Sequence, residues 1–244
     1  MNSTVFSLTL KQIAGRRRSL TMFGLVIVPI LLALIFRLGE HLDQQDWTAN
    51  VLLDGIILTI VLPLACLILG TSAFGSEVED GTAVYILAKP IPRREIIIAK
   101  FAAAALVTAA FVVPATVISG LLALRGASED GLVIGFAVAV TFGVAAYTGL
   151  FILLSVVTSR ALLIGLAYVF IWEGIATELF TGTRFLSIRQ YSLGIADLIS
   201  SVRKQDFEAN LGGAEGLILG SAVAAIALFL AVRRLERFEL TETD

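Results

Sequence analysis

The stretch that decides the fold is GLVIGFAVAVTFGVAAYTGLFILLSVVTS, residues 131–159, which contains no charged side chain. An α-helix rises about 1.5 Å per residue, so about 20 apolar residues in a row are needed to cross the hydrocarbon core of a bilayer. This run exceeds that length. It therefore predicts a transmembrane helix rather than a buried helix of a water-soluble domain.

Comparable apolar runs lie on both sides of it. Four of them contain no charged residue and cover 19–36, 55–76, 101–124 and 216–232. Another run, 161–180, is interrupted only by Glu173 and Glu178, and we count it as a span because an even number is needed if both ends of the chain share one side. With the residues that complete each helix, the six predicted spans are 19–38, 54–76, 96–124, 131–158, 161–180 and 213–232.

The composition agrees with lipid as the solvent. Hydrophobic residues make up 57% of the 244 positions and the mean hydropathy is +0.92. This composition gives more apolar surface than a soluble domain can bury away from water. The spans use up most of the length, so we predict a single all-α integral membrane domain over 1–244 with no separate catalytic domain. The net charge of −2 gives no reason to propose a nucleic-acid partner. Cys66 is the single cysteine and lies in an apolar run, so no metal site is predicted.

The orientation follows from the basic residues, because translocation disfavours Lys and Arg in short loops. Arg16 to Arg18 before an apolar run could also open a signal peptide, but no small-residue cleavage pattern follows Phe36. We predict a multi-pass protein of the cell (inner or plasma) membrane with both termini cytoplasmic. This arrangement places twelve of the eighteen basic residues inside, namely Lys11, Arg16, Arg17, Arg18, Lys89, Arg93, Arg94, Lys100, Arg160, Arg233, Arg234 and Arg237.

Two segments outside the spans have helical patterns. Residues 2–18 place Phe6, Leu10 and Ile13 on one face, typical of a helix in the membrane interface, although Phe6, Leu8 and Leu10 also alternate like a strand. The exterior segment 184–210 has apolar residues at spacings of three and four, which predicts an amphipathic helix resting on the outer surface before the last span. Its apolar positions are Ile188, Tyr191, Ile195, Leu198 and Val202.

The cytoplasmic loop 77–95 between the second and third spans holds the strongest functional signal. Residues 77–100 read EVEDGTAVYILAKPIPRREIIIAK, in which Gly81 and Thr82 can restart a helix and Pro90 stops it. The short helix between them carries Tyr85 and Leu87. Apolar side chains on a cytoplasmic loop need a partner surface, so we interpret the loop as a docking element; the alternative is a solvated connector.

This segment resembles the ABC-2 type transporter permease family, whose members carry Glu-x-Glu-x-Gly-Thr, a Leu, Pro-Ile-x-Arg and a later Lys after their second span. The layout of spans is also similar, and the chain looks closest to small stand-alone permeases such as the membrane subunit of the copper-site maturation transporter for nitrous-oxide reductase. The matching positions are Glu77, Glu79, Gly81, Thr82, Leu87, Pro90, Ile91, Arg93 and Lys100.

The resemblance implies a function for the loop and a set of partners. In the family this loop is the coupling helix that sits in a cleft of a cytoplasmic ATPase, and two permeases, identical or different, pair across a central pathway. The sequence has no G-x-x-x-x-G-K-[ST] motif, since its lysines are followed by Gln12, Pro90, Phe101 and Gln205. This chain is therefore expected to bind no cofactor and not to be an enzyme, with ATP and Mg bound by two copies of a partner ATPase subunit.

Two further features have alternative interpretations. Glu173 lies at membrane depth, where an ionisable residue is costly; it either packs against a buried partner or lines a transport pathway. Gly212, Gly216 and Gly220 recur every fourth residue at the start of the last span. Such a stripe lets another backbone approach, either within the chain or in a dimer.

The sequence thus favours an ATP-driven permease that moves its substrate outward by alternating access. One alternative is a secondary carrier driven by protons through Glu173, which predicts internal repeats that are not evident. The other is an intramembrane enzyme, which is disfavoured because the single histidine, His41, lies outside the spans.

Overall fold

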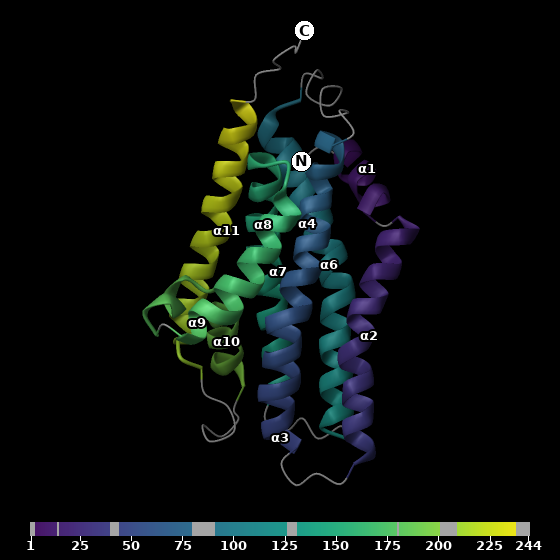
Figure 1. Ribbon diagram of the computed structural model, residues 1–244, viewed down its shortest axis with the longest axis vertical. Helices are drawn as coiled ribbons and strands as arrows, with labels where there is room; N and C mark the ends of the chain where they lie inside the picture. The colour runs from purple at the N-terminus through teal and green to yellow at the C-terminus, as the bar shows by residue number, and fades with distance from the viewer. Residues whose placement is uncertain are drawn as a thin grey trace.

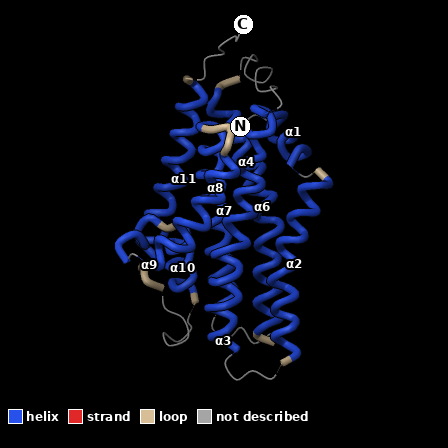
Figure 2. Tube along the Cα trace, in the orientation of Figure 1, coloured by secondary structure: helices blue, strands red, loops and turns tan. Residues whose placement is uncertain are grey.

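The computed structural model describes residues 3–13, 15–39, 44–79, 91–125, 131–179, 181–200 and 209–237. Within these ranges all regular structure is helical, which confirms the all-α prediction (Figure 2). The helices are α1 (Ser3–Ile13), α2 (Arg16–Leu38), α3 (Gln44–Asp46), η1 (Trp47–Val61), α4 (Leu62–Glu79), α6 (Arg93–Ala123), α7 (Leu132–Val157), α8 (Ala161–Ala167), η2 (Tyr168–Ala176), α9 (Thr177–Leu179), η3 (Thr181–Leu186), α10 (Ile188–Ile199) and α11 (Gly213–Glu236).

Five helical stretches in the described ranges are long and apolar enough to cross a membrane: Arg18–Leu38, Gln44–Gly75, Arg93–Ala123, Leu132–Val157 and Gly213–Glu236. They run side by side along the long axis, with α1 and the last turns of α11 at the same end (Figure 1). The predicted span 161–180 forms a shorter apolar helix, Ala161–Ala176, in which regular α-helix changes to π-helix at Tyr168. The count of six spans therefore remains a prediction.

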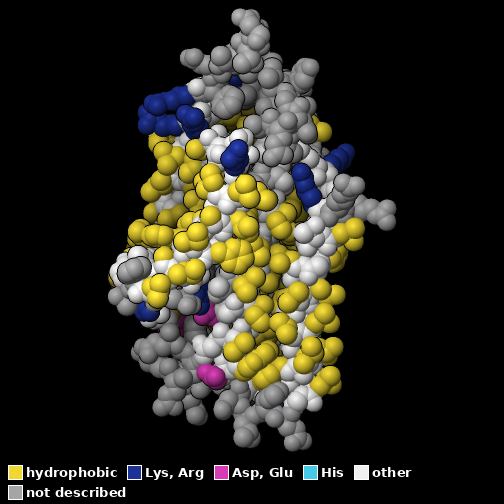
Figure 3. All heavy atoms as spheres, viewed as in Figure 1, with side chains coloured by type: hydrophobic (Ala, Val, Ile, Leu, Met, Phe, Trp, Pro, Cys, Tyr) yellow, Lys and Arg dark blue, Asp and Glu magenta, His cyan; other side chains and the backbone are white. Residues whose placement is uncertain are grey.

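The surface distribution of charge fits a protein that lies across a bilayer. On the face shown in Figure 3, most Lys and Arg side chains gather at the end that carries α1, and apolar side chains cover the middle. Large apolar residues of α2, α8 and α11 are about half exposed, for example Leu31, Leu163 and Phe229. Such a surface is stable only against lipid or another membrane helix.

Helix α7 is the centre of the bundle and packs against α4, α6, α10 and α11. Its large side chains Phe136, Tyr147 and Phe151 are fully buried. Lipid is as apolar as leucine, so membrane helices associate through close packing, which small residues permit. At Gly143 an added Cβ would lie 2.8 Å from both the Leu62 Cδ2 and the Ser192 Oγ, so a larger residue there would displace these side chains of α4 and α10.

The second membrane helix begins earlier than the predicted span 54–76. The helical backbone starts at Gln44 and continues through η1 into α4. Trp47 stacks on Phe36 at the end of α2, with ring centroids 3.7 Å apart and planes 4° apart. This contact fixes the start of the helix beside the end of the previous one, which the apolar pattern alone does not reveal.

Residues 3–13 form a helix, so the strand alternative for this segment is wrong. The buried face of α1 consists of Val5, Thr9 and Ile13, and the Thr9 hydroxyl donates to the Val5 carbonyl at 2.9 Å. Leu8 is exposed. Because α1 packs against α6, its inner face is defined by a helix neighbour as well as by the membrane interface.

The amphipathic helix predicted in 184–210 is present as α10, but it does not rest on the surface of the bundle. It packs against both α7 and α11, with Ile188 and all of 190–196 buried, while Leu198 is exposed. The backbone of Gly194 allows this fit, since an added Cβ would lie 2.8 Å from the Leu211 carbonyl oxygen. The polar residues at the start of the helix find partners inside the protein.

Candidate functional site: the coupling loop and the buried carboxylates

The predicted docking loop is held at both ends by helices. Gly81, Thr82, Tyr85, Leu87 and Pro90 lie outside the described residues. Helix α4 runs to Glu79 and α6 begins at Arg93, so both helices extend into the predicted loop 77–95 and include Glu77 and Glu79 on one side. Arg93 follows Pro92 in the first turn of α6, and its Nη1 atom is buried with no hydrogen-bond partner among the described residues.

A buried lysine joins these two helices. Lys100 of α6 is fully buried; its Nζ donates to the Ala73 carbonyl at 2.6 Å and lies 5.2 Å from the centre of the Phe74 ring. An ammonium group at this depth needs such partners, because desolvation without them is costly. Ile96 and Ile97 belong to the same apolar cluster as Phe74. The start of α6 is thereby fastened to the end of α4, one on each side of the loop.

Glu173 caps the start of α10. Its side chain is 1% exposed, and Oε1 accepts hydrogen bonds from the Ile188 N–H at 2.9 Å and the Tyr168 hydroxyl at 3.0 Å. Oε2 accepts from the Ser187 hydroxyl at 2.5 Å. Ser187 is the N-cap residue and its Oγ accepts from the Gln190 N–H. A carboxyl group at a helix N-terminus satisfies unpaired N–H groups and interacts favourably with the helix dipole.

Two tyrosines border this carboxyl group. The Tyr147 hydroxyl is buried and interacts electrostatically with Glu173. The Tyr191 hydroxyl donates to the Phe185 carbonyl at 2.5 Å. Burial, and to a smaller extent the charge of Glu173, raise the pKa of Tyr191, so this phenol stays protonated and can donate. The donors to Glu173 are therefore Tyr168, Ser187 and the Ile188 N–H, whereas Tyr191 donates elsewhere.

A second carboxylate reaches the same turn of α10. Asp54 of η1 and Arg189 form a two-pronged ion pair, with Nε to Oδ1 and Nη2 to Oδ2 both at 2.8 Å across a separation of 135 residues. The Arg189 and Asp54 side chains are 12% and 17% exposed. Bidentate pairs of this geometry are among the stronger charge-assisted hydrogen bonds. Asp54 and Glu173 both come from π-helical stretches and together fix the first turn of α10.

We expect the Asp54–Arg189 pair to show energetic coupling. Asp54→Ala and Arg189→Ala should each destabilise the purified protein, and the double variant should lose about 1–2 kcal/mol less than the sum, because each single change already removes the shared interaction. Thermal unfolding in detergent measures all three. Arg184→Ala combined with Asp54→Ala is the control, since Arg184 binds the Asn210 side chain instead, and these two changes should add. Additive effects for Asp54 and Arg189 as well would mean that the pair contributes nothing.

The glycine stripe of α11 faces helices of the same chain. At Gly216 an added Cβ would lie 2.6 Å from the Tyr191 carbonyl oxygen, and at Gly220 it would lie 2.4 Å from the Phe142 ring. Gly212 precedes the helix as its N-cap and has no such close neighbour. Gly216 and Gly220 thus lie against α10 and α7 in the described structure, where they allow α11 to approach.

No group of three or more His, Cys, Asp or Glu residues that could hold a metal ion occurs in the described ranges. The described residues that the sequence singled out fall into two places. Arg93 lies at the start of α6, and Glu173 lies against the start of α10, a helix that Gly216 of α11 approaches at Tyr191. Asp54, Arg189 and Ser187 complete the second place but were not predicted as site residues.

Comparison with known families gives one finding. A family model described as ABC-2 family transporter protein matches residues 7–240. A search of curated proteins found no match.

Proposed function

Since that match covers nearly the whole length, this chain belongs to the ABC-2 transporter family, and from this premise we propose that it is the permease subunit of an ABC exporter driven by a separate ATPase. Members of this family are membrane components of transporters, and the chain is a multi-pass membrane protein. The proposal adds the outward direction, the ATPase partner and the pairing of two permeases around two ATPase subunits.

The family match is the observation that carries the proposal, and two features of the chain support it. The sequence lacks a phosphate-binding G-x-x-x-x-G-K-[ST] loop, so the nucleotide has to be bound by another polypeptide. The loop after the second membrane helix carries apolar residues between glycine and proline positions of its sequence, a pattern that suits docking into a cleft. ATP and Mg would be bound by the partner and not by this chain.

The contact between Lys100 and α4 gives a route by which movement of the ATPase can be transmitted to the membrane helices. Lys100 ties the end of α4 to α6, so a displacement of the loop by a closing ATPase dimer would move both helices together. Packed helices transmit such shifts because close-packed interiors deform little. Helix α4 also packs against α7 and α8, through which the movement would reach the rest of the bundle.

The geometry around Glu173 supports ATP over protons as the energy source. Its carboxyl oxygens accept three hydrogen bonds, two of them from the N-terminus of α10. A proton carrier needs a carboxyl group that gains and loses its proton during the cycle, whereas a capping group performs its role without such a change. The glycine stripe faces its own chain, so we propose that the second permease contacts another surface.

Purification in mild detergent from the native membrane tests the proposal. We expect an ATPase subunit with a G-x-x-x-x-G-K-[ST] motif to copurify and mass spectrometry to find it in amounts equal to this chain. A complex without any nucleotide-binding protein, together with transport that proceeds without ATP, would favour the proton-driven carrier.

The topology gives a second prediction. Cysteines introduced at Ser128 and Ser201 should react with an impermeant maleimide in intact cells, whereas a cysteine at Thr241 should react only after permeabilisation. The natural Cys66 is buried and should give little background. Labelling at Thr241 in intact cells would reverse the proposed orientation.

A further inference from the structure

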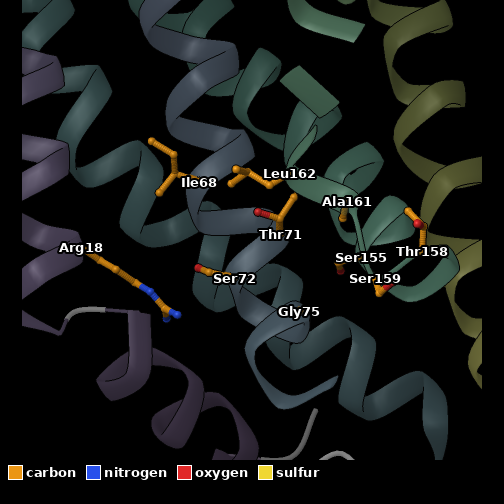
Figure 4. A pocket seen from close by; sticks show the side chains of 10 residues that line it. All are labelled: Arg18, Ile68, Thr71, Ser72, Gly75, Ser155, Thr158, Ser159, Ala161 and Leu162. Atoms are coloured by element: carbon orange, nitrogen blue, oxygen red, sulfur yellow. The ribbon is translucent and has the colours of Figure 1, made fainter. Parts of the chain in front are cut away.

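We infer that a cavity at the α1 end of the bundle binds the phosphate head group of a membrane lipid. The cavity has a volume of about 240 Å³ and is bounded by four segments distant in the chain: the first turn of α2, the second half of α4, the end of α7 and the start of α8. Figure 4 shows Arg18 extending from α2 toward Ser72 of α4, with Ser155 and Ser159 on the other side.

The charge of the lining selects an anion. Arg18 is the one charged residue among the described residues that line the cavity, and no carboxylate lines it. The Arg18 Nη1 donates to the Gln12 carbonyl at 3.2 Å, which orients the guanidinium while its other N–H groups remain as donors. A guanidinium with several donors in one plane matches the oxygens of a phosphate group.

The hydroxyl groups of the lining indicate that the ligand carries hydrogen-bond donors in addition to its phosphate. The Thr158 Oγ1 accepts from the Arg160 N–H at 3.2 Å, so its own proton can be donated to a phosphate oxygen. Thr71 and Ser155 instead donate to carbonyls of their own helices, at 2.6 and 2.8 Å. Their lone pairs are then available to accept hydrogen bonds from a ligand. A phosphate ester that also carries hydroxyl or ammonium groups, such as phosphoglycerol or phosphoethanolamine, matches both kinds of lining group. Its phosphate oxygens can accept from Arg18 and Thr158, and its hydroxyl or ammonium group can donate to the remaining hydroxyl oxygens.

The apolar part of the lining indicates that the ligand is a lipid rather than free phosphate. Ile68 and Leu162 border the polar groups, and Leu162 is 50% exposed. The next residues of α8, Leu163 and Ile164, are also exposed and apolar. An acyl chain attached to the bound head group could lie along this surface, whereas inorganic phosphate would leave it uncovered.

Two glycines offer a matched pair of variants. No described atom lies within 4 Å of the position that a Cβ would take at Gly75, which lines the cavity, or at Gly24, which lies on α2 away from it. Gly75→Leu should therefore fill the cavity without disturbing the packing of α4. Gly24→Leu makes the same change in a membrane helix and leaves the cavity open.

Thermal unfolding of the purified full-length chain in a neutral detergent tests the site. Saturating dioctanoyl phosphatidylglycerol should raise the Tm by about 5 °C, because a ligand that binds the folded state stabilises it by mass action. Gly75→Leu should abolish the shift and Gly24→Leu should keep it. Arg18→Gln should weaken binding about tenfold or more, since it removes the charge that meets the phosphate. Inorganic phosphate alone and dioctanoyl phosphatidylcholine, whose head group has no N–H or O–H donor, should have little effect.

Several results would overturn this assignment. An undiminished shift in Gly75→Leu would place the lipid elsewhere, and equal losses in Gly75→Leu and Gly24→Leu would show a general effect on folding. A full shift with inorganic phosphate would identify a soluble anion as the ligand. An equal shift with phosphatidylcholine would exclude the proposed role of the hydroxyl groups. The readout requires no ATPase, so it is independent of the proposed transport function.

Discussion

Replacing Tyr85 and Leu87 together by serine is expected to release the ATPase from the purified complex. Each apolar anchor buried in an interface contributes about 2 kcal/mol or more, so losing two should weaken the association by roughly 1,000-fold. The permease should still insert and fold, because these residues lie in the loop between two membrane helices. Copurification and the ATP turnover of the complex measure the effect.

Arg93 and Arg94 provide the matched control within the same segment. Arg93 has a partly buried guanidinium, whereas Arg94 is exposed in the next position. Arg93→Ala should weaken the complex in a salt-dependent way, and Arg94→Ala should have little effect, since isolated exposed charges contribute little to affinity. Normal ATPase binding and turnover in the Tyr85 and Leu87 double variant would show that the loop is only a solvated connector.

Truncating Glu173 to alanine is expected to cost about 3 kcal/mol or more of stability, because two buried donors and one partly buried donor would lose their acceptor. The Ser187 hydroxyl, the Ile188 N–H and the Tyr168 hydroxyl would then be unpaired inside the bundle. The start of α10 should loosen first. Hydrogen exchange of the Ile188 amide and thermal unfolding in detergent measure the local and global effects.

Glu173→Gln separates a capping role from a proton-transfer role. An amide keeps one oxygen acceptor for Ile188 and Tyr168, so this variant should retain most of the stability and normal coupling of ATP turnover. If it assembles and hydrolyses ATP normally but no longer transports, Glu173 belongs to the pathway and the capping interpretation is wrong.

The membrane helices could be predicted from the sequence because the apolar run that identifies each one lies within the helix itself. The uncharged run 131–159 predicts a span wherever its neighbours lie, and the structure forms α7 there. The change from α-helix to π-helix at Tyr168 has no such signal, since it depends on how the chain packs against its neighbours.

The site around α10 was only partly predictable. Ser187 before a periodic apolar run is a recognisable N-cap signal, and it indicates the start of this helix. The acceptor that completes the cap, Glu173, lies 14 residues earlier on another element, and the Asp54–Arg189 pair joins residues 135 positions apart. A single sequence contains no information on such distant pairings. Helix α10 has the predicted amphipathic pattern. The pattern alone does not distinguish a helix that packs against other helices from one that lies on a membrane surface, because both surroundings are apolar.

Photo-crosslinking from the loop in living cells tests the account most directly. Benzoylphenylalanine placed at Tyr85 should form an adduct, after illumination, with a polypeptide that carries a G-x-x-x-x-G-K-[ST] motif, and the same probe at Ser128 on the opposite side should not. Adducts from Tyr85 that contain only lipid or this chain, in cells where the complex transports, would contradict the proposal that the loop couples this permease to an ATPase.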